Sequence, residues 1–284
     1  MTAGPRRSAP PRPWAAMFGL VTPGSWPALA VLLVIAALPR LLPRRPLLLV
    51  RLRTAGPERV PVWLRPSASD ARNLVEVLAL YELPLPLPDQ SVRTVLDLGA
   101  AFGAASAVFA ARFPHARILS VEPAADNVEV LRRNAAQSGR AWQVVAAAVG
   151  VRSGTAQFHH SRWSTSGSIV PLVGLTRQGD PTRAEYRTAR PPRSVPVVPV
   201  DRLLAEHGLS QVDVCKVDIE GSEEELFGAG DGGWLDRVTV LLVEIHDKYV
   251  DGPRVRRCIE DRGFRPFGTP GRTNLHCYLK EQPG

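Results

Sequence analysis

Cysteine is scarce in this chain of 284 residues, and its three cysteines lie far apart, at Cys215, Cys258 and Cys277. No Cys-x-x-Cys pair is present, so the sequence indicates no disulfide framework. A reducing, cytoplasmic setting fits this pattern best. Hydrophobic residues make up 45% of the chain, which is enough for a buried core.

Acidic residues are almost absent from the first 65 residues, where ten arginines stand against the single acid Glu58. The rest of the chain holds 25 basic and 26 acidic residues and is nearly neutral. The basic character of the protein therefore belongs to its N-terminal segment. Because such a charge excess is the usual signal of nucleic-acid binding, and it is missing from the remainder, we expect no nucleic-acid partner.

A long uninterrupted hydrophobic run is also missing. Residues 14–38 carry no charge and 26–38 are strongly apolar, but Pro23 and Pro27 break the run. About a dozen residues are left, whereas a membrane-spanning helix needs roughly 20. Three interpretations stay open: a soluble or partner-packed helix, membrane association through residues 14–42 (peripheral or as a single span), and a secretion signal.

The chain divides into three parts by composition and pattern. Residues 1–46 form a Pro- and Arg-rich, then apolar, extension. Residues 47–91 hold two short strands, expected to form a hairpin, and a capped helix over 70–80. Residues 92–284 form the main domain, in which the Ser-, Thr-, Arg- and Pro-rich segment 161–194 is expected to be a long loop or lid.

Strands and helices alternate in the main domain, which is typical of an α/β fold with a mostly parallel sheet. The clearest unit is the apolar strand Thr94–Leu98, followed by a glycine-containing turn and a helix over 104–112. Further strands are predicted at 118–122, 143–147, 155–159, 195–200, 212–218, 238–245 and 275–280. Further helices are predicted at 126–138, 201–207, 221–227 and 253–262.

The first strand of this domain ends in the turn Asp97-x-Gly99-x-x-x-Gly103. Glycine permits the unusual backbone angles of such a turn and lets a ligand touch the main chain. The spacing differs from the Gly-x-Gly-x-x-Gly of dinucleotide-binding turns. An acid before the glycines suits a ligand that bears a cation, such as S-adenosylmethionine with its amino and sulfonium groups. Glu122 ends the next strand, about twenty residues later, where an acid can accept hydrogen bonds from a ribose.

Acids also stand at the ends of two later strands, at Asp218 and Glu244. Because the carboxyl ends of parallel strands meet at one edge of a sheet, these two should converge with Asp97 and Glu122 on one crevice. His246 lies two residues beyond Glu244 and is expected beside the same crevice. Two bland interpretations apply nearby: Lys216 pairs with an acid, and the acids at 223 and 224 stabilise a helix N-terminus.

With these motifs the chain resembles the FkbM-type family of S-adenosylmethionine-dependent methyltransferases. The resemblance covers roughly residues 60–280. The matching segments are Val95–Gly103, Val121–Pro123 with Asn127, Ala146–Gly150, Lys216–Glu223 and Val243–His246. One departure is Ala101-Phe102, where many relatives carry a polar residue followed by an aliphatic one. The family implies a Rossmann-like, seven-stranded class I methyltransferase fold, here with an N-terminal helical and hairpin extension.

The resemblance also implies an activity, which is methyl transfer from S-adenosylmethionine to a hydroxyl of a natural-product or sugar acceptor. Carried over, Asp97, Gly99 and Gly103 would cradle the methionine and ribose portion of the cofactor. Glu122 would bind the ribose hydroxyls, and Ala147 would line the adenine. The other motif positions assigned to the cofactor site are Ala100, Phe102, Pro123 and Asn127.

An aliphatic hydroxyl is about as weak an acid as water, with a pKa near 15.7, so its methylation benefits from a general base. Asp218 is our first candidate for that base and His246 the second. No metal is expected, because Asp218, Glu244 and His246 show no tight ligand spacing, and a divalent ion held by these three is kept only as a variant. Two other functions stay open: a nicotinamide-dependent oxidoreductase, and a catalytically silent module tethered to a membrane by residues 14–42.

Overall fold

The computed structural model describes residues 47–53, 59–80, 84–160, 167–169, 191–228, 232–268 and 274–281. The apolar N-terminal segment 14–42 and most of the expected lid 161–194 lie outside these ranges, so what the sequence predicts for them stays a prediction. Within the described ranges, every helix is too short or too polar to cross a membrane.

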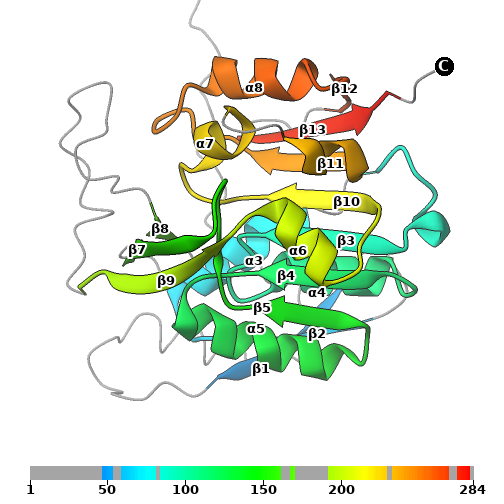
Figure 1. The fold of residues 1–284 in the computed structure, drawn as a ribbon. Coiled ribbons are helices and arrows are strands. Elements are labelled where there is room, and N and C mark those ends of the chain that lie inside the picture. Colours follow the sequence, from blue (N-terminus) through cyan, green and yellow to red (C-terminus); the bar gives the residue numbers. More distant parts are fainter. Residues whose placement is uncertain are drawn as a thin grey trace, which may run out of the picture.

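A seven-stranded sheet forms the centre of the structure (Figure 1), in the order β12-β13-β11-β10-β3-β4-β5. Its strands are β3 (Thr94–Leu98), β4 (Arg117–Val121), β5 (Trp142–Val145), β10 (Val212–Val217), β11 (Val238–Glu244), β12 (Phe264–Pro266) and β13 (Leu275–Lys280). Neighbouring strands from β11 to β5 are parallel, whereas β13 is antiparallel to both of its neighbours. The chain order reverses between β3 and β10, which is where open α/β sheets bind ligands. The predicted Rossmann-like, seven-stranded α/β fold is confirmed.

Helices cover both faces of this sheet because its strands are apolar on both sides. Val95 and Ile118 belong to one buried cluster, and their neighbours Leu96 and Leu119 belong to another on the opposite face. The first cluster packs against α4 (Ala104–Arg112) and α5 (Ala125–Ser138), and the second against α6 (Val200–Glu206), α7 (Glu223–Gly228) and α8 (Gly252–Glu260). Two short 3₁₀ helices, η2 (Asp89–Ser91) and η3 (Gly233–Arg237), lie in connections.

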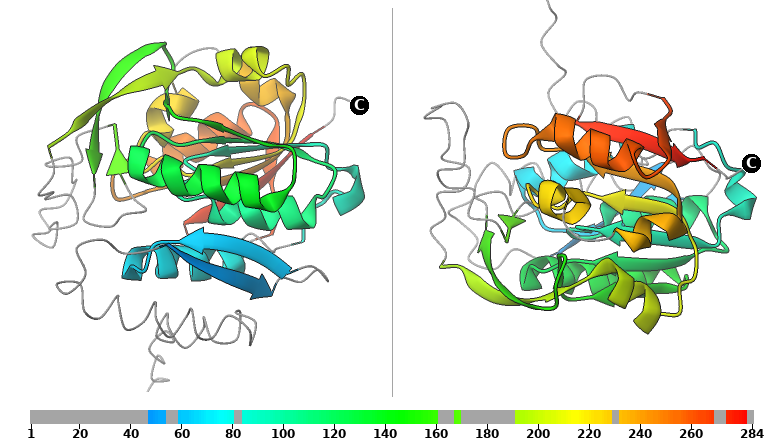
Figure 2. Two further views of the ribbon diagram at one scale, coloured as in Figure 1. Left: turned by 90° about the horizontal axis from the view of Figure 1, so that it is seen from below. Right: turned by 45° about the horizontal axis from the view of Figure 1, so that its top comes forward.

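The expected N-terminal hairpin is formed by β1 (Leu48–Arg53) and β2 (Arg59–Leu64), which pair antiparallel, and it is followed by α3 (Ala68–Leu80). Figure 2 shows the hairpin lying outside α4 and α5. Its buried residues belong to the same cluster as the sheet face that α4 covers. Ser67 caps α3, since its hydroxyl oxygen accepts a hydrogen bond from the Asp70 backbone N–H at 3.1 Å.

A smaller sheet stands beside the carboxyl ends of the central strands, in the order β6-β9-β7-β8. It consists of β6 (Ala148–Val149), β7 (Gly154–His160), β8 (Gly167–Ser168) and β9 (Arg193–Val198). Every strand and helix predicted from residue 47 onward is present in the described ranges, with ends shifted by at most two residues. Strands β6, β8 and β12 were not predicted, because two or three residues are too few to show a period of two.

Candidate active site

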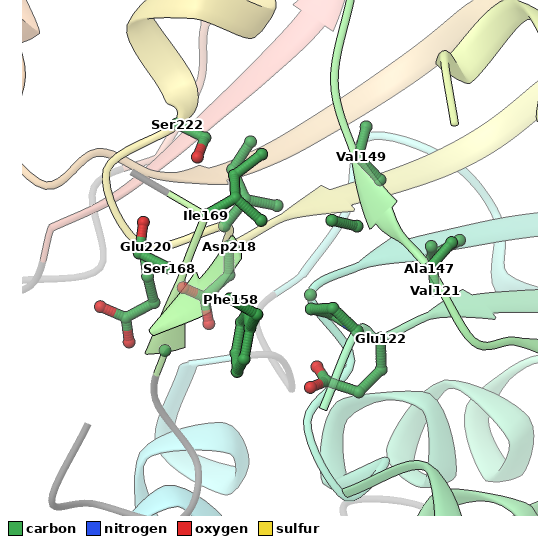
Figure 3. Close-up of a pocket in the computed structure, with 15 residues that line it drawn as sticks. Val121, Glu122, Ala147, Val149, Phe158, Ser168, Ile169, Asp218, Glu220 and Ser222 are labelled. Atoms are coloured by element: carbon green, nitrogen blue, oxygen red, sulfur yellow. The ribbon is translucent and has the colours of Figure 1, made fainter. Parts of the chain in front are cut away.

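A pocket opens at the point where the order of the sheet reverses, and it contains about 530 Å³ of space not filled by atoms, part of it open to solvent. Small-molecule sites typically occupy about 300–1,000 Å³. Figure 3 shows Glu122 on one side of the pocket, Asp218 and Glu220 on the other, and Phe158 between them. The other lining residues are Gly99, Val121, Pro123, Ala147, Ala148, Val149, Gly167, Ser168, Ile169, Ile219 and Ser222.

The turn after β3 has positive φ angles at Gly99 (80°), Ala101 (49°) and Gly103 (90°). A Cβ atom on Gly99 would lie 1.8 Å from the backbone oxygen of Asp218, so glycine lets the turn pack directly on the loop after β10. A Cβ atom on Gly103 would instead lie 2.5 Å from Leu131 Cδ1. The first glycine therefore shapes the pocket, and the second allows close packing between α4 and α5.

Asp97 lies beneath the glycine turn and is fully buried. Its carboxylate accepts a hydrogen bond of 2.5 Å from the Ser106 hydroxyl and pairs with Lys216 Nζ at 3.1 Å. Lys216 also donates to the backbone oxygen of Gly99 at 3.0 Å. Burial alone would lower the pKa of Lys216, but the carboxylates of Asp97 and Asp218 outweigh it and raise that pKa. Asp97 and the charged Lys216 therefore support the turn from below, and the bland interpretation of Lys216 as the partner of an acid is confirmed.

Glu122 is 5% exposed and faces the pocket directly after β4. Its carboxylate accepts hydrogen bonds from Ala101 N (3.0 Å), Ala124 N (2.9 Å) and Asn127 Nδ2 (3.1 Å). Burial raises the pKa of Glu122, although these three bonds act in the opposite direction. Because a carboxylate offers about four acceptor positions, roughly one is left for a ligand hydroxyl.

Asn127 lies behind Glu122 and outside the pocket lining. Its side-chain oxygen accepts a hydrogen bond of 2.7 Å from Arg65 Nη2. Arg65 is also paired with the buried Asp70, with 3.0 Å between Nε and Oδ2. The guanidinium group can only donate, so it fixes the Asn127 amide with its NH₂ group toward Glu122. The hairpin segment thereby orients the carboxylate of the pocket.

His246 lies close to three acidic side chains. Its Nδ1 is 2.7 Å from Glu223 Oε1, and its Nε2 is 3.5 Å from Glu220 Oε2 and 3.8 Å from Asp218 Oδ1. Burial alone would lower the pKa of His246, but the carboxylates of Glu220, Glu223 and Asp218 raise it well above the ordinary 6.5. These carboxylates therefore favour the protonated imidazole, which argues against our second candidate for the base.

The structure separates the predicted site residues into two groups. The pocket lining includes Gly99, Glu122, Pro123, Ala147 and Asp218. The positions outside the lining are Asp97, Ala100, Phe102, Gly103, Asn127 and His246, of which Ala100 and Phe102 are buried in the core beneath the turn. Whether these residues contact a cofactor stays a prediction.

Several pocket residues were not selected from the sequence, namely Phe158, Ile169, Glu220 and Ser222. Phe158 lies in β7, and Ile169 directly follows β8. No sequence motif marks either residue. Glu220 and Ser222 lie within the segment Lys216–Glu223, so their place directly after Asp218 was the available signal.

The fold also brings together the three residues that we kept, from the sequence, as a variant metal site. One ligand atom each from Asp218, Glu244 and His246 lies within 4.8 Å of the other two. We expected no metal because these positions show no tight spacing along the chain. The three residues meet nevertheless, since β10 and β11 are neighbours in the sheet, and the absence of a metal stays a prediction.

Comparisons with known proteins agree with this geometry. The model of a family described as the methyltransferase FkbM domain matches residues 97–266. The AMB antimetabolite synthetase AmbE of Pseudomonas aeruginosa is 28% identical over 194 residues, which cover 57% of this chain and 9% of that protein. The methyltransferase sdnD of Sordaria araneosa is 26% identical over 188 residues, or 60% of this chain and 73% of that protein.

A further relative is the 2-O-methyltransferase NoeI of Sinorhizobium fredii, which is 25% identical over 187 residues. The match covers 65% of this chain and 73% of that protein. The chain thus spans less than a tenth of the length of the synthetase and about three quarters of the two methyltransferases.

Proposed function

The chain belongs to the FkbM family of methyltransferases, and we propose that it transfers a methyl group from S-adenosylmethionine to a hydroxyl of a small-molecule acceptor, a sugar or another natural product. Membership in a methyltransferase family decides against the nicotinamide-dependent oxidoreductase. The name of the relative NoeI, a 2-O-methyltransferase, supports oxygen as the acceptor atom. The observation that carries the proposal is the pocket at the reversal of the sheet, with Glu122 on one side and Asp218 on the other.

The pocket suits this cofactor in three respects. Three carboxylates line it (Glu122, Asp218 and Glu220), and no lysine or arginine does so among the lining residues of the described chain. This charge favours a ligand with a sulfonium and an amino group over one with a pyrophosphate. Gly99 lets the turn pack directly on the loop that carries Asp218, and Ala147 and Val149 offer an apolar wall for an adenine.

S-adenosylmethionine supplies, when bound, a methyl group activated by a positively charged sulfur. The side chains of the protein then have to align the acceptor hydroxyl and take its proton. Asp218 is 20% exposed, and its carboxylate is held between Lys216 Nζ (3.6 Å) and His246 Nε2 (3.8 Å). A base typically contributes about 10²–10⁴-fold, whereas alignment contributes up to roughly 7–11 kcal/mol. We therefore assign Asp218 both tasks, with alignment as the larger contribution.

The test is a methyl-transfer assay with isotopically labelled S-adenosylmethionine and a panel of sugars and other hydroxyl compounds. Once an acceptor is found, Asp218→Asn should lower turnover by about 10²-fold or more while cofactor affinity stays within a few-fold. Asp236→Asn, at an exposed position of η3, is the matched control and should change neither. Loss of cofactor binding in Asp218→Asn, with turnover kept at saturating cofactor, would instead place Asp218 in the cofactor site.

A further inference from the structure

The ends of β10 and β11 bring three metal-ligating side chains to one side of the pocket. Val217 and Val243 are paired across the two strands, and Asp218 and Glu244 directly follow them. His246 lies two residues further along, and one ligand atom from each of these three residues falls within 4.8 Å of the others. From this arrangement we propose that Asp218, Glu244 and His246 bind a divalent metal ion beside the pocket.

The support of His246 matches that of a metal-bound histidine. Glu223 is fully buried and lies 2.7 Å from Nδ1, so it holds the ring and leaves Nε2 toward Asp218 and Glu220. Metal-ligating histidines almost always donate their second ring nitrogen in this way to a carboxylate or carbonyl. The 3.8 Å between Nε2 and Asp218 Oδ1 is too long for a hydrogen bond. An ion about 2.0–2.2 Å from each atom would bridge that separation, and it would take the place of the proton on Nε2.

An independent observation comes from Ser222. This residue is 4% exposed, and its hydroxyl has no hydrogen-bond partner in the part of the chain that the structure describes. It lines the same pocket as Asp218 and Glu220, and Figure 3 shows its oxygen directed toward them. A buried polar group without a partner costs about 1–3 kcal/mol. A water or acceptor oxygen on an open position of the ion provides the missing partner.

The donor set defines the class of ion. Two carboxylates favour hard cations such as Mg²⁺ and Mn²⁺, and an imidazole favours first-row transition ions. Mn²⁺ satisfies both preferences. Three protein ligands leave positions open on the ion, and an ion there would lower the pKa of an acceptor hydroxyl. This catalytic role rests on the proposed methyl transfer, whereas metal binding itself does not.

Lys216 competes only weakly with a metal ion for the carboxylate of Asp218, because other contacts hold its ammonium group. Its Nζ lies 3.6 Å from Asp218 Oδ2, but it is closer to Asp97 (3.1 Å) and to the backbone oxygen of Gly99 (3.0 Å). Those two contacts hold the ammonium group beneath the glycine turn. Asp218 Oδ1, on the side of His246, is the oxygen assigned to the ion.

The experiment is a titration of the chelator-treated full chain with Mn²⁺, in which the electron paramagnetic resonance signal measures free ion. We expect one ion per chain. Glu244→Gln and Asp218→Asn should each weaken binding by at least about 10-fold, and Glu223→Gln, which alters only the support of His246, by about 10–100-fold. Glu224→Gln, on the same helix as Glu223 but paired with Arg254 at the surface, should bind Mn²⁺ as the wild type does.

A second measurement needs no variant. Mn²⁺ should broaden the imidazole resonances of His246 at substoichiometric amounts. It should broaden those of His207 far less, because His207 lies at the amino ends of the strands, beside Arg117, the first residue of β4. Absence of stoichiometric binding, or equal binding by Glu244→Gln and wild type, would overturn the proposal. Titration of the same samples with S-adenosylhomocysteine separates the metal site from the proposed methyl transfer. A chain that binds this cofactor product but no Mn²⁺ would overturn only the metal site.

Discussion

Replacing Glu122 with glutamine removes the charge that we assign to the ribose of the cofactor. Three of about four acceptor positions on this carboxylate are already used, by Ala101 N, Ala124 N and Asn127 Nδ2. The substitution therefore removes one charge-assisted hydrogen bond to a ligand hydroxyl, which contributes about 1.5–3 kcal/mol. The dissociation constant of S-adenosylhomocysteine should rise by about 10- to 150-fold.

Isothermal titration calorimetry measures this change, and thermal denaturation shows whether the variant is folded. Glu129→Gln, at an exposed position of the same helix as Asn127, is the matched control and should leave the affinity unchanged. A folded Glu122→Gln protein with wild-type affinity would refute the ribose assignment. We prefer glutamine to alanine because glutamine keeps one acceptor oxygen and deprives only one of the buried N–H groups of Ala101 and Ala124, whereas alanine leaves both without an acceptor.

The same carboxylate makes cofactor binding depend on pH. Burial raises the pKa of Glu122 above the ordinary 4.5. Since the charged form accepts the ribose hydroxyl, binding should be complete above the raised pKa and fall as the pH drops through it. The loss therefore starts at a higher pH than it would for an exposed glutamate, and it should be absent in Glu122→Gln. In the cofactor-free protein the sign is opposite: the raised pKa favours folding most below 4.5, and that contribution is lost as the pH rises through the folded-state value.

Two further substitutions test the supports of the pocket. Gly99→Ala should lower the melting temperature more than Gly139→Ala does. Both positions have positive φ, which costs a residue with a side chain about 1–2 kcal/mol, but only at Gly99 does the added Cβ meet backbone, at 1.8 Å, while Gly139 has open space. Arg65→Lys should weaken cofactor binding because Asn127 loses its fixed orientation. The expected change is about 2- to 12-fold, which corresponds to one hydrogen bond of roughly 0.5–1.5 kcal/mol. A variant with the affinity of the wild type would show that Arg65 only anchors the hairpin.

Much of the fold was predictable because the central strands β3, β4, β10 and β11 are largely apolar runs that end at a glycine or an acid. Thr94–Leu98 shows this pattern, and its bounds in the structure are those predicted. The same pattern placed Glu122 and Asp218 at strand ends, and both line the pocket. Strand β12 was missed because it has three residues and ends at Pro266, and proline is unfavourable within strands.

The supporting contacts could not be predicted, because they join segments that are distant in the chain. His246 and Glu223 are 23 residues apart and meet only where α7 lies beside the end of β11. Arg65 and Asn127 are 62 residues apart and meet because the hairpin packs on α5. From the sequence we interpreted Glu223 as an acid at a helix N-terminus, and its position in the first turn of α7 bears this out. That interpretation did not include the contact of Glu223 with His246.

The most direct test of the central claim is a calorimetric titration of the full chain with S-adenosylhomocysteine and, separately, with NAD⁺. If the pocket at the reversal of the sheet binds the methyl donor, the protein will form a one-to-one complex with S-adenosylhomocysteine and give no measurable heat with NAD⁺. A folded chain that binds NAD⁺ instead, or that binds neither compound, would contradict the assignment of this pocket as a methyltransferase cofactor site.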